Sequence, residues 1–270
     1  MIMHLLIALA LVAGCKSTSQ SQVAASTVIS ESEILDLTKY KATAEDYAKF
    51  RTELGTQYER QLQQLTEARK QTGRQIPKIF DSLTEEEAVA IYHYSSMGYR
   101  TLNAVLRKAD IANTAKQAGF IKVLSSALNK LPAVQATVYR GGMLPAFGNG
   151  DYFSPFHSIK TVDPDRLARF KVGQIFVDKG FMSTSLHNPD GIRQAFGCRE
   201  ALYTIHGNYG REISALAVIP NEREILFIPG SEFRIEKINN TYPPENKCNN
   251  EVIEIEATEV EPGTYKDEAQ

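Results

Sequence analysis

Two glutamates one residue apart, Glu222 and Glu224, are the side chains whose spacing points most directly to chemistry. An apolar run at 225–228 follows them and predicts a β-strand that includes the pair. Side chains alternate across a strand, so both carboxylates should share one face while Arg223 points the other way. Because like charges on one face repel each other, the pair predicts a cationic group between or in front of the two carboxylates.

A second candidate functional residue, an arginine, lies at the end of an earlier strand candidate. Arg140 follows the β-branched and aromatic residues of 137–139, and Gly141 and Gly142 come next. A guanidinium can grip a diphosphate with two parallel hydrogen bonds, and glycines let a ligand approach the backbone. An arginine before a turn is also common as a solvated strand end, so Arg140 alone does not identify a ligand.

A serine–threonine cluster, Ser183-Thr184-Ser185, follows Gly180 and Phe181 in a third strand candidate. The sequence has no G-x-S-x-G motif and no histidine placed as an evident base, so a hydrolase nucleophile is not predicted. The five histidines are scattered, without H-E-x-x-H or C-x-x-C spacing, so no metal site is expected. Serine and threonine are common in strands, and the cluster is a weak signal by itself.

The elements that must position these residues predict an α+β fold. Helices are expected at 30–73, 84–108 and 119–130. Capping boxes are predicted at Ser30 with Glu33 and at Thr84 with Glu87. Helices that precede a run of short strands indicate α+β rather than a repeating βαβ sheet. The candidate strands are 135–140, 174–178, 180–184, 201–206, 213–218, 223–228, 232–238 and 251–258.

Composition bounds the class of protein. The chain has 270 residues, of which 43% are hydrophobic and 23% are charged, as is ordinary for a globular protein. The formal net charge is −2 and no long basic run occurs, so nucleic acid is not an expected partner.

The first fifteen residues resemble an export signal. Residues 5–13 are continuously apolar but fall short of the ~20 residues that a membrane-spanning helix needs. The ending at Cys15 resembles a bacterial lipoprotein signal, in which a lipid on Cys15 would anchor the chain to a membrane; an ordinary export signal with a chance cysteine is the alternative. The expected location is secreted, or the outer membrane as a lipoprotein. Cys198 and Cys248 would then form a disulfide or remain two unrelated thiols.

Taken in order, Arg140, the cluster at 183–185 and the Glu222-x-Glu224 pair resemble the active-site signature of arginine-specific mono-ADP-ribosyltransferases, especially bacterial toxins. The order, spacing and strand context of the three motifs are similar to those of the family over roughly residues 81–257. The resemblance implies a mono-ADP-ribosyltransferase fold, an α+β domain of two packed, mostly antiparallel sheets with flanking helices. NAD would be the co-substrate, bound between the sheets, and no metal is implied.

The resemblance also implies a role for each residue. Arg140, beside Gly141, would bind the phosphate and ribose of NAD, and Ser183 would hold the cleft together and hydrogen-bond Glu224. Glu224 would stabilise an oxocarbenium-like ribose as nicotinamide leaves. Glu222 would orient the acceptor guanidinium and take its proton. Further NAD contacts are expected from Thr184, Arg193 and Phe196, although plain helix packing is an equal alternative for the last two.

The expected activity is transfer of ADP-ribose from NAD to an arginine of a host protein. In the family, Glu rather than Gln at the position of Glu222 favours arginine as acceptor. The stretch 214–224 resembles the family's substrate-recognition loop, although Ala217, Val218 and Ile219 stand where many members carry an exposed aromatic residue. Two alternatives remain: an NAD glycohydrolase using the same site, and a non-enzymatic lipoprotein that binds a partner through residues 31–72.

The expected division of the chain follows from these interpretations. It comprises a signal at 1–15, a flexible tether at 16–30, an N-terminal helical arm at 31–76, a catalytic domain at 77–262 and a loose tail at 263–270.

Overall fold

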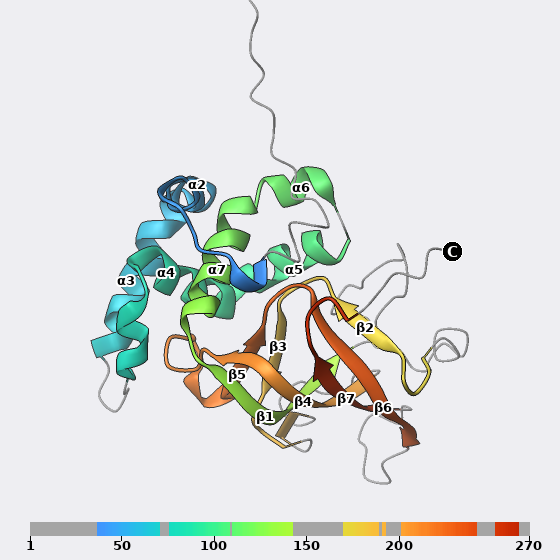
Figure 1. Ribbon diagram of the computed structural model, residues 1–270. Coiled ribbons are helices and arrows are strands. Elements are labelled where there is room, and N and C mark those ends of the chain that lie inside the picture. The colour runs from blue at the N-terminus through green and yellow to red at the C-terminus, as the bar shows by residue number, and fades with distance from the viewer. Residues whose placement is uncertain are drawn as a thin grey trace, which may run out of the picture.

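The computed structural model describes residues 37–70, 76–108, 110–142, 170–188, 191–192, 201–241 and 252–264. Helices occupy the first half of the chain and strands the second, and the helices lie together over one side of the strands (Figure 1). The expected α+β class is therefore confirmed. The predicted signal and tether, together with Cys15, Cys198 and Cys248, lie outside the described residues.

The helical layer begins where the sequence provides caps. The expected capping box at Thr84 and Glu87 is confirmed, and another forms at Thr43 and Asp46. Gly55, with φ of 54°, divides the single long helix expected before residue 73 into two. The helices are α2 (Ala44–Leu54), α3 (Thr56–Lys70), α4 (Glu85–His93), α5 (Tyr99–Arg107), α6 (Ile111–Ala115) and α7 (Ala118–Lys130). Shorter turns are η1 (Leu37–Lys39), η2 (Lys78–Ser82), the π-turn η3 (Tyr94–Gly98) and η4 (Pro220–Glu222).

The helices α2, α3, α4 and α7 pack around one apolar core. Phe50 of α2 and Leu65 of α3 are buried against Ile91 of α4 and Phe120 of α7. The rings of Phe50 and Phe120 lie 5.5 Å apart. The described part of the segment expected to form an N-terminal arm therefore shares its hydrophobic core with the helices that follow it.

The strands form a connected network in which β4 joins two layers. The strands are β1 (Ala133–Gly142), β2 (Ile175–Asp178), β3 (Met182–Ser185), β4 (Ala201–Glu212), β5 (Glu224–Phe227), β6 (Ser231–Thr241) and β7 (Val252–Val260). Their order is β1-β3-β5-β4-β7-β6-β2, with an additional pairing of β1 with β4. β4 pairs with β1 along 201–211 and with β7 over its first half, 201–206, while its end at 211–212 pairs with β5. The two layers thus belong to one continuous seven-stranded sheet that is joined through β4, and all pairings except β4–β7 are antiparallel.

A second core lies between these two layers. Val138 of β1 and Met182 of β3 are buried in the same cluster as Phe233 of β6 and Ile255 of β7. Phe227 of β5 meets Phe233 edge to face, with ring centroids 5.4 Å apart. This core fixes β1, β3 and β5, the strands that carry the motifs found in the sequence.

The stretch 213–218, expected as a strand, is a turn instead. The amides of Leu216 and Ala217 both donate to the carbonyl of Ile213, at 2.9 and 3.0 Å. All three side chains are buried, and Ile213 and Leu216 join the helical core. Residues at i, i+3 and i+4 have helical spacing, and a short apolar run does not distinguish this pattern from a buried strand.

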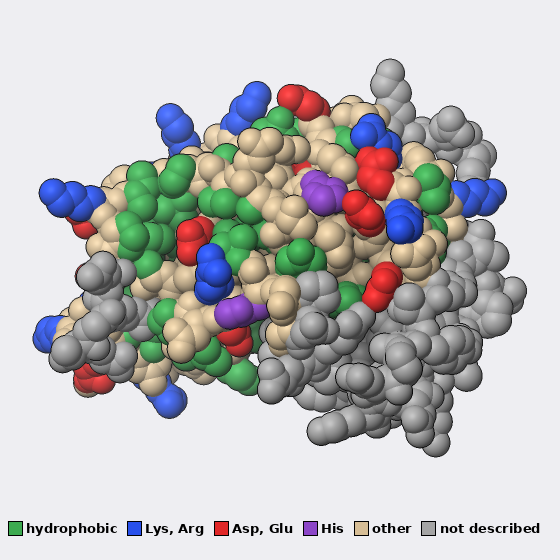
Figure 2. All heavy atoms as spheres, turned by 90° about the horizontal axis from the view of Figure 1, so that it is seen from below, with side chains coloured by type: hydrophobic (Ala, Val, Ile, Leu, Met, Phe, Trp, Pro, Cys, Tyr) green, Lys and Arg blue, Asp and Glu red, His purple; other side chains and the backbone are tan. Residues whose placement is uncertain are grey.

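The surface carries charge of both signs. On the face seen from below in Figure 2, lysine and arginine side chains are interspersed with acidic ones, and hydrophobic side chains gather over one side. Within the described ranges, no helix has the length and apolar character needed to cross a bilayer.

Glu87 connects three helices, and its substitution should destabilise the helical layer. Its fully buried carboxylate accepts hydrogen bonds from Tyr47, Ser126 and Lys130, at 3.1, 2.7 and 2.7 Å. Burial raises the pKa of Glu87, but Lys130 and the hydrogen-bond donors outweigh it, so the pKa lies below its ordinary 4.5. We expect Glu87→Gln to lower the free energy of unfolding at pH 7 by ~1–3 kcal/mol in urea denaturation.

The effect should depend on pH in a defined direction. A depressed folded-state pKa contributes stability above the unfolded value, and this contribution is lost as the pH falls through the folded value. The difference between wild type and Glu87→Gln should therefore shrink below pH ~4. Exposed Glu45, in the first turn of α2, provides a matched control, Glu45→Gln, that should change stability by less than ~0.5 kcal/mol. Equal losses for both variants would contradict this prediction.

Candidate active site

Three neighbouring strands bring the predicted residues together. Arg140 lies near the end of β1, Ser183 lies in β3, and Glu224 is the first residue of β5. Ser185 of β3 is paired with Tyr139 on one side and with Glu224 on the other. Motifs far apart in the sequence thus meet because β3 lies between the two strands that carry the arginine and the glutamate.

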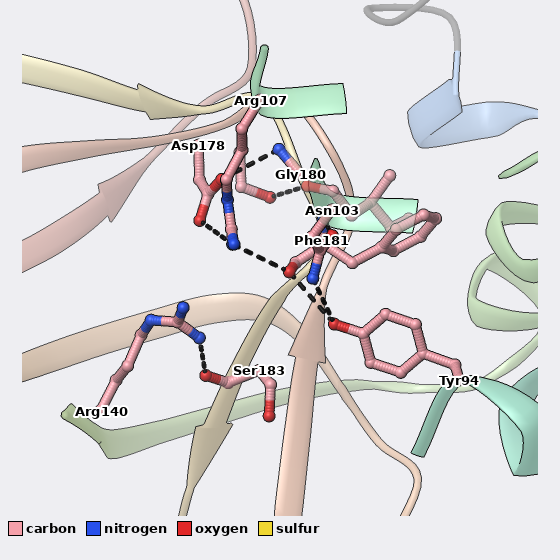
Figure 3. Close-up of polar contacts among 10 residues, drawn as sticks. Tyr94, Asn103, Arg107, Arg140, Asp178, Gly180, Phe181 and Ser183 are labelled. Atoms are coloured by element: carbon pink, nitrogen blue, oxygen red, sulfur yellow. Dashed lines mark hydrogen bonds and ion pairs between the residues drawn. The ribbon is translucent and has the colours of Figure 1, made fainter. Parts of the chain in front are cut away.

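The Arg140 guanidinium is fixed against the backbone of β3. Its Nη1 donates to the carbonyl of Ser183 at 2.6 Å, as the lower part of Figure 3 shows. Burial and repulsion from Arg107 lower the pKa of Arg140, whereas Asp178 acts in the opposite direction. Of the described carboxylates, none lies within ion-pair distance of Arg140. A partly buried cation in this setting would be stabilised by an anionic ligand.

The Glu224 carboxyl is buried, and its ionisation is correspondingly difficult. Glu224 as a whole residue is 5% exposed to solvent. The pKa of Glu224 is raised to about 7, chiefly by burial and further by the charge of Glu222. The Ser183 side chain and the charge of Arg140 act in the opposite direction and lower the pKa. The group would therefore change its charge near neutral pH, which is typical of functional carboxylates.

Glu222 does not lie on the strand, which corrects the alternation expected for the pair. It ends the η4 turn, and Arg223 adopts a left-handed conformation with φ of 49° before β5 begins at Glu224. The carbonyl of Glu222 accepts a hydrogen bond from Ser185 Oγ at 2.6 Å. The carboxylates of Glu222 and Glu224 are close enough to interact electrostatically. The η4 turn, and not the alternation of side chains along a strand, brings them together. Glu222 is only half-buried, and burial raises its pKa.

The other predicted ligand contacts have different positions. Gly141 follows Arg140 in β1 and pairs with Leu202 of β4. The Thr184 side chain is buried and donates to the carbonyl of Ile225 at 2.8 Å, so the structure does not bring it to the group formed by Arg140, Ser183 and Glu224. Arg193 and Phe196 lie outside the described residues.

A buried polar network that the sequence did not reveal holds the start of β3. Arg107 of α5 pairs with Asp178 of β2 through two hydrogen bonds, both 2.9 Å long. Asn103 accepts from the amide of Phe181 at 2.8 Å and donates to the Tyr94 hydroxyl at 3.0 Å. Figure 3 shows these residues above and beside Ser183, linking the helical layer to the segment between β2 and β3.

The sequence contained only part of the signal for this network. Asn103 and Arg107 are four residues apart, which places them on one face of a helix. Their partners, Asp178 and Phe181, come from a segment more than seventy residues later. Polar side chains on a helix face are usually solvated, so this spacing alone does not predict a buried contact.

Comparison with known families gives a decisive match. A family model described as ADP-ribosyltransferase exoenzyme matches residues 49–261. The chain belongs to this family. The resemblance inferred from the three motifs is therefore confirmed, and the match begins within α2.

Individual ADP-ribosyltransferases agree with this assignment. The NAD(+)–protein-arginine ADP-ribosyltransferase Tre1 of Serratia proteamaculans is 32% identical over 166 residues, which cover 59% of this chain and 31% of Tre1. The structure of ADP-ribosyltransferase HopU1 of Pseudomonas syringae pv. tomato aligns with a TM-score of 0.60 and 22% identity, covering 82% of this chain and all of HopU1. ADP-ribosyltransferase Vis, solved with agmatine, aligns with a TM-score of 0.52 and 23% identity, covering 77% and 88% of the two chains. The structural neighbours confirm the fold, whereas the chain spans only 17–63% of the length of the first curated relatives that it matches.

Asp178→Asn should destabilise this ADP-ribosyltransferase fold more than loss of an exposed ion pair. Burial raises the pKa of Asp178, but Arg107 more than offsets it and leaves the pKa below its ordinary value. Neutralising Asp178 would remove the negative charge that faces the Arg107 guanidinium in a site where both side chains are mostly buried. We expect a loss of ~2–4 kcal/mol in denaturant unfolding.

An exposed pair provides the matched comparison. Arg234 and Glu236 form an ion pair with both side chains exposed to solvent, so Glu236→Gln should cost less than ~1 kcal/mol. If the two variants lost the same stability, the buried pair would not hold the start of β3 in the way described.

Proposed function

We propose that this chain transfers ADP-ribose from NAD to an arginine of a protein and releases nicotinamide. The observation that carries the proposal is that β5 places the buried Glu224 carboxyl beside β3, and that the Arg140 guanidinium is fixed against Ser183 of the same strand β3. Membership of the ADP-ribosyltransferase exoenzyme family supports the reaction type. The name of Tre1 supports arginine as the acceptor. So does the complex of Vis with agmatine, because agmatine carries a guanidine group.

NAD fits the charges and the backbone of the site. Arg140 would bind the diphosphate, because its guanidinium is fixed by the Ser183 carbonyl and its buried charge would be stabilised by an anionic ligand. At Gly142 a β-carbon would lie 3.5 Å from both Arg140 Nε and Tyr203, so a side chain there would occupy the space beside the guanidinium. Gly142 thus leaves room for a ligand next to Arg140.

The two glutamates would perform different steps. Cleavage of the bond from ribose to nicotinamide leaves the electron pair on the nicotinamide nitrogen, which is already cationic, so no general acid is required. Ionised Glu224 would stabilise the positive charge that develops on the ribose. Glu222, which is half-buried in the η4 turn, would orient the acceptor guanidinium. A nitrogen of this guanidinium forms the new bond to the ribose, and Glu222 would accept the proton that the nitrogen loses.

The acceptor and the location of the chain extend the proposal. A host protein would supply the acceptor arginine, and the turn at 213–222 would contact it through exposed Val218 and Ile219. Export would depend on the apolar segment at 5–13, with Cys15 as a possible site of lipid anchoring. The catalytic domain would extend over 77–262, with the helices before residue 76 packed on it.

Single substitutions should separate the two carboxylates. With labelled NAD and agmatine, protein lacking residues 1–25 should transfer label to agmatine and slowly hydrolyse NAD. We expect Glu222→Gln to reduce transfer at least ~100-fold while hydrolysis persists. Glu224→Gln should reduce both at least ~100-fold, because it removes the charge that stabilises the ribose.

The outcomes distinguish the possible activities. Hydrolysis without transfer by the wild type would indicate an NAD glycohydrolase. The absence of any NAD turnover would contradict the enzyme assignment and leave a binding protein on the same fold. Arg234→Gln, at an exposed ion pair far from the three motifs in the sheet order, should leave both rates unchanged.

The rate of NAD hydrolysis should follow the ionisation of Glu224. Because the pKa of Glu224 is raised to about 7 and the ionised form is required, kcat/KM should fall about tenfold per pH unit below 7 and level off above it. In Glu222→Gln a like charge is removed, so the midpoint should move to lower pH. A midpoint that stays near 4.5 in the wild type would contradict the role of burial at Glu224.

A further inference from the structure

The helix that runs from Glu85 to Arg107 contains one irregular turn, the π-turn η3. A π-turn inserts an extra residue into the helix and often occurs at functional sites. Two of its residues contact the segments that lead to the proposed catalytic groups. The Tyr94 hydroxyl donates to the carbonyl of Phe181 at 3.2 Å, shortly before Ser183. Ser95 Oγ accepts a hydrogen bond from the amide of Val218 at 2.9 Å, shortly before Glu222.

The turn between β4 and β5 has a buried first half and an exposed second half. Leu216 and Ala217 are at most 1% exposed, whereas Val218 and Ile219 are 38% and 52% exposed. The hydrogen bond from Val218 to Ser95 lies where this change occurs. It joins residues 123 positions apart in the chain and connects the exposed half to the helical layer.

Beyond Val218 the amides of the turn donate to nearby carbonyls. The amide of Glu222 donates to the carbonyl of Ile219 at 3.2 Å, and the amide of Arg223 donates to Pro220 at 3.1 Å. At the far end, Ser185 Oγ donates to the carbonyl of Glu222 and His187 Nε2 donates to the carbonyl of Asn221. The Ser95 hydroxyl at one end and the side chains of Ser185 and His187 at the other therefore bracket the exposed segment that carries Glu222.

Glu224 has a different support. It lies on β5, is buried, and is paired with Ser185 in the ladder between β3 and β5. Loss of the Ser95 hydroxyl would loosen the segment 218–222 without removing a contact of Glu224. The geometry therefore allows acceptor positioning and NAD cleavage to be affected separately.

We propose that Ser95 is a positioning residue for the acceptor step, and this inference rests on the proposed transferase function. Its hydroxyl holds the Val218 amide, so that the turn presents Glu222 to the incoming guanidinium. Ser95 thereby sets the ratio of transfer to hydrolysis without contacting NAD or the acceptor.

The chain offers a matched control one residue away. Ser95 Oγ and Ser96 Oγ both donate to the carbonyl three residues before them, at 2.9 and 2.8 Å, and both residues are half-buried. Of these two hydroxyl groups, that of Ser95 accepts the hydrogen bond from the turn. Ser95→Ala and Ser96→Ala thus make the same change to the helix, and Ser95→Thr keeps the hydroxyl.

The first measurement is the ratio of agmatine modification to NAD hydrolysis in the full set of variants. Ser95→Ala should lower this ratio about fivefold or more, the effect of one net hydrogen bond, while hydrolysis stays within about twofold of wild type. Ser96→Ala should leave the ratio unchanged, and Ser95→Thr should restore it. An unchanged ratio in Ser95→Ala, an equal fall in both activities, or the same effect in Ser96→Ala would overturn the proposal.

A second measurement tests the anchor independently of activity. Amide hydrogen exchange in the segment 218–222 should accelerate in Ser95→Ala but not in Ser96→Ala, with α7 and β5 protected as in wild type. Unchanged exchange in that segment would overturn the anchoring role. A wild type that turns over no NAD would instead overturn the proposed transferase function, and the exchange data would still decide whether Ser95 holds the turn.

Discussion

The burial of the Glu224 carboxyl at the start of β5 is the constraint on which the site depends. A carboxylate removed from water is costly to ionise, and Glu224 has one hydroxyl donor and one nearby guanidinium to offset that cost. Its pKa near 7 shows that the compensation is incomplete. The protein therefore holds a destabilising group in place, and the surrounding strands must be stable enough to keep it there.

Two features supply that stability. The layers that meet at β4 enclose the aromatic and branched side chains of the second core, which fixes the spacing of β1, β3 and β5. Hydrogen bonds from Arg107 to Asp178 and from the Phe181 amide to Asn103 fix the position of the start of β3 relative to the helices. Arg140 and Ser183 can then face Glu224 with little freedom to move away.

The two carboxylates differ in their mechanical support. Glu224 belongs to a strand held on both sides, whereas Glu222 belongs to a half-exposed turn that side-chain hydrogen bonds hold at its two ends. Under the proposed function, this difference would suit one group that keeps a fixed geometry for cleavage of NAD and another that adapts to a protein acceptor. The π-turn in the helix between α4 and α5 lies against both segments and so connects the rigid group to the adaptable one.

Local chemistry in the sequence determined the capped helices, the α+β order and the three motifs of the family. Capping by Thr84 and Glu87 and the apolar stripes depend on near neighbours, which is why the pattern alone predicts them. Tertiary structure decided that 213–218 is a turn, because its apolar side chains fill the helical core rather than a sheet. It also placed Glu222 on a turn instead of a strand and paired Arg107 with Asp178. These outcomes depend on contacts between residues far apart in the chain, whose geometry is set by packing and not by the spacing of residue types.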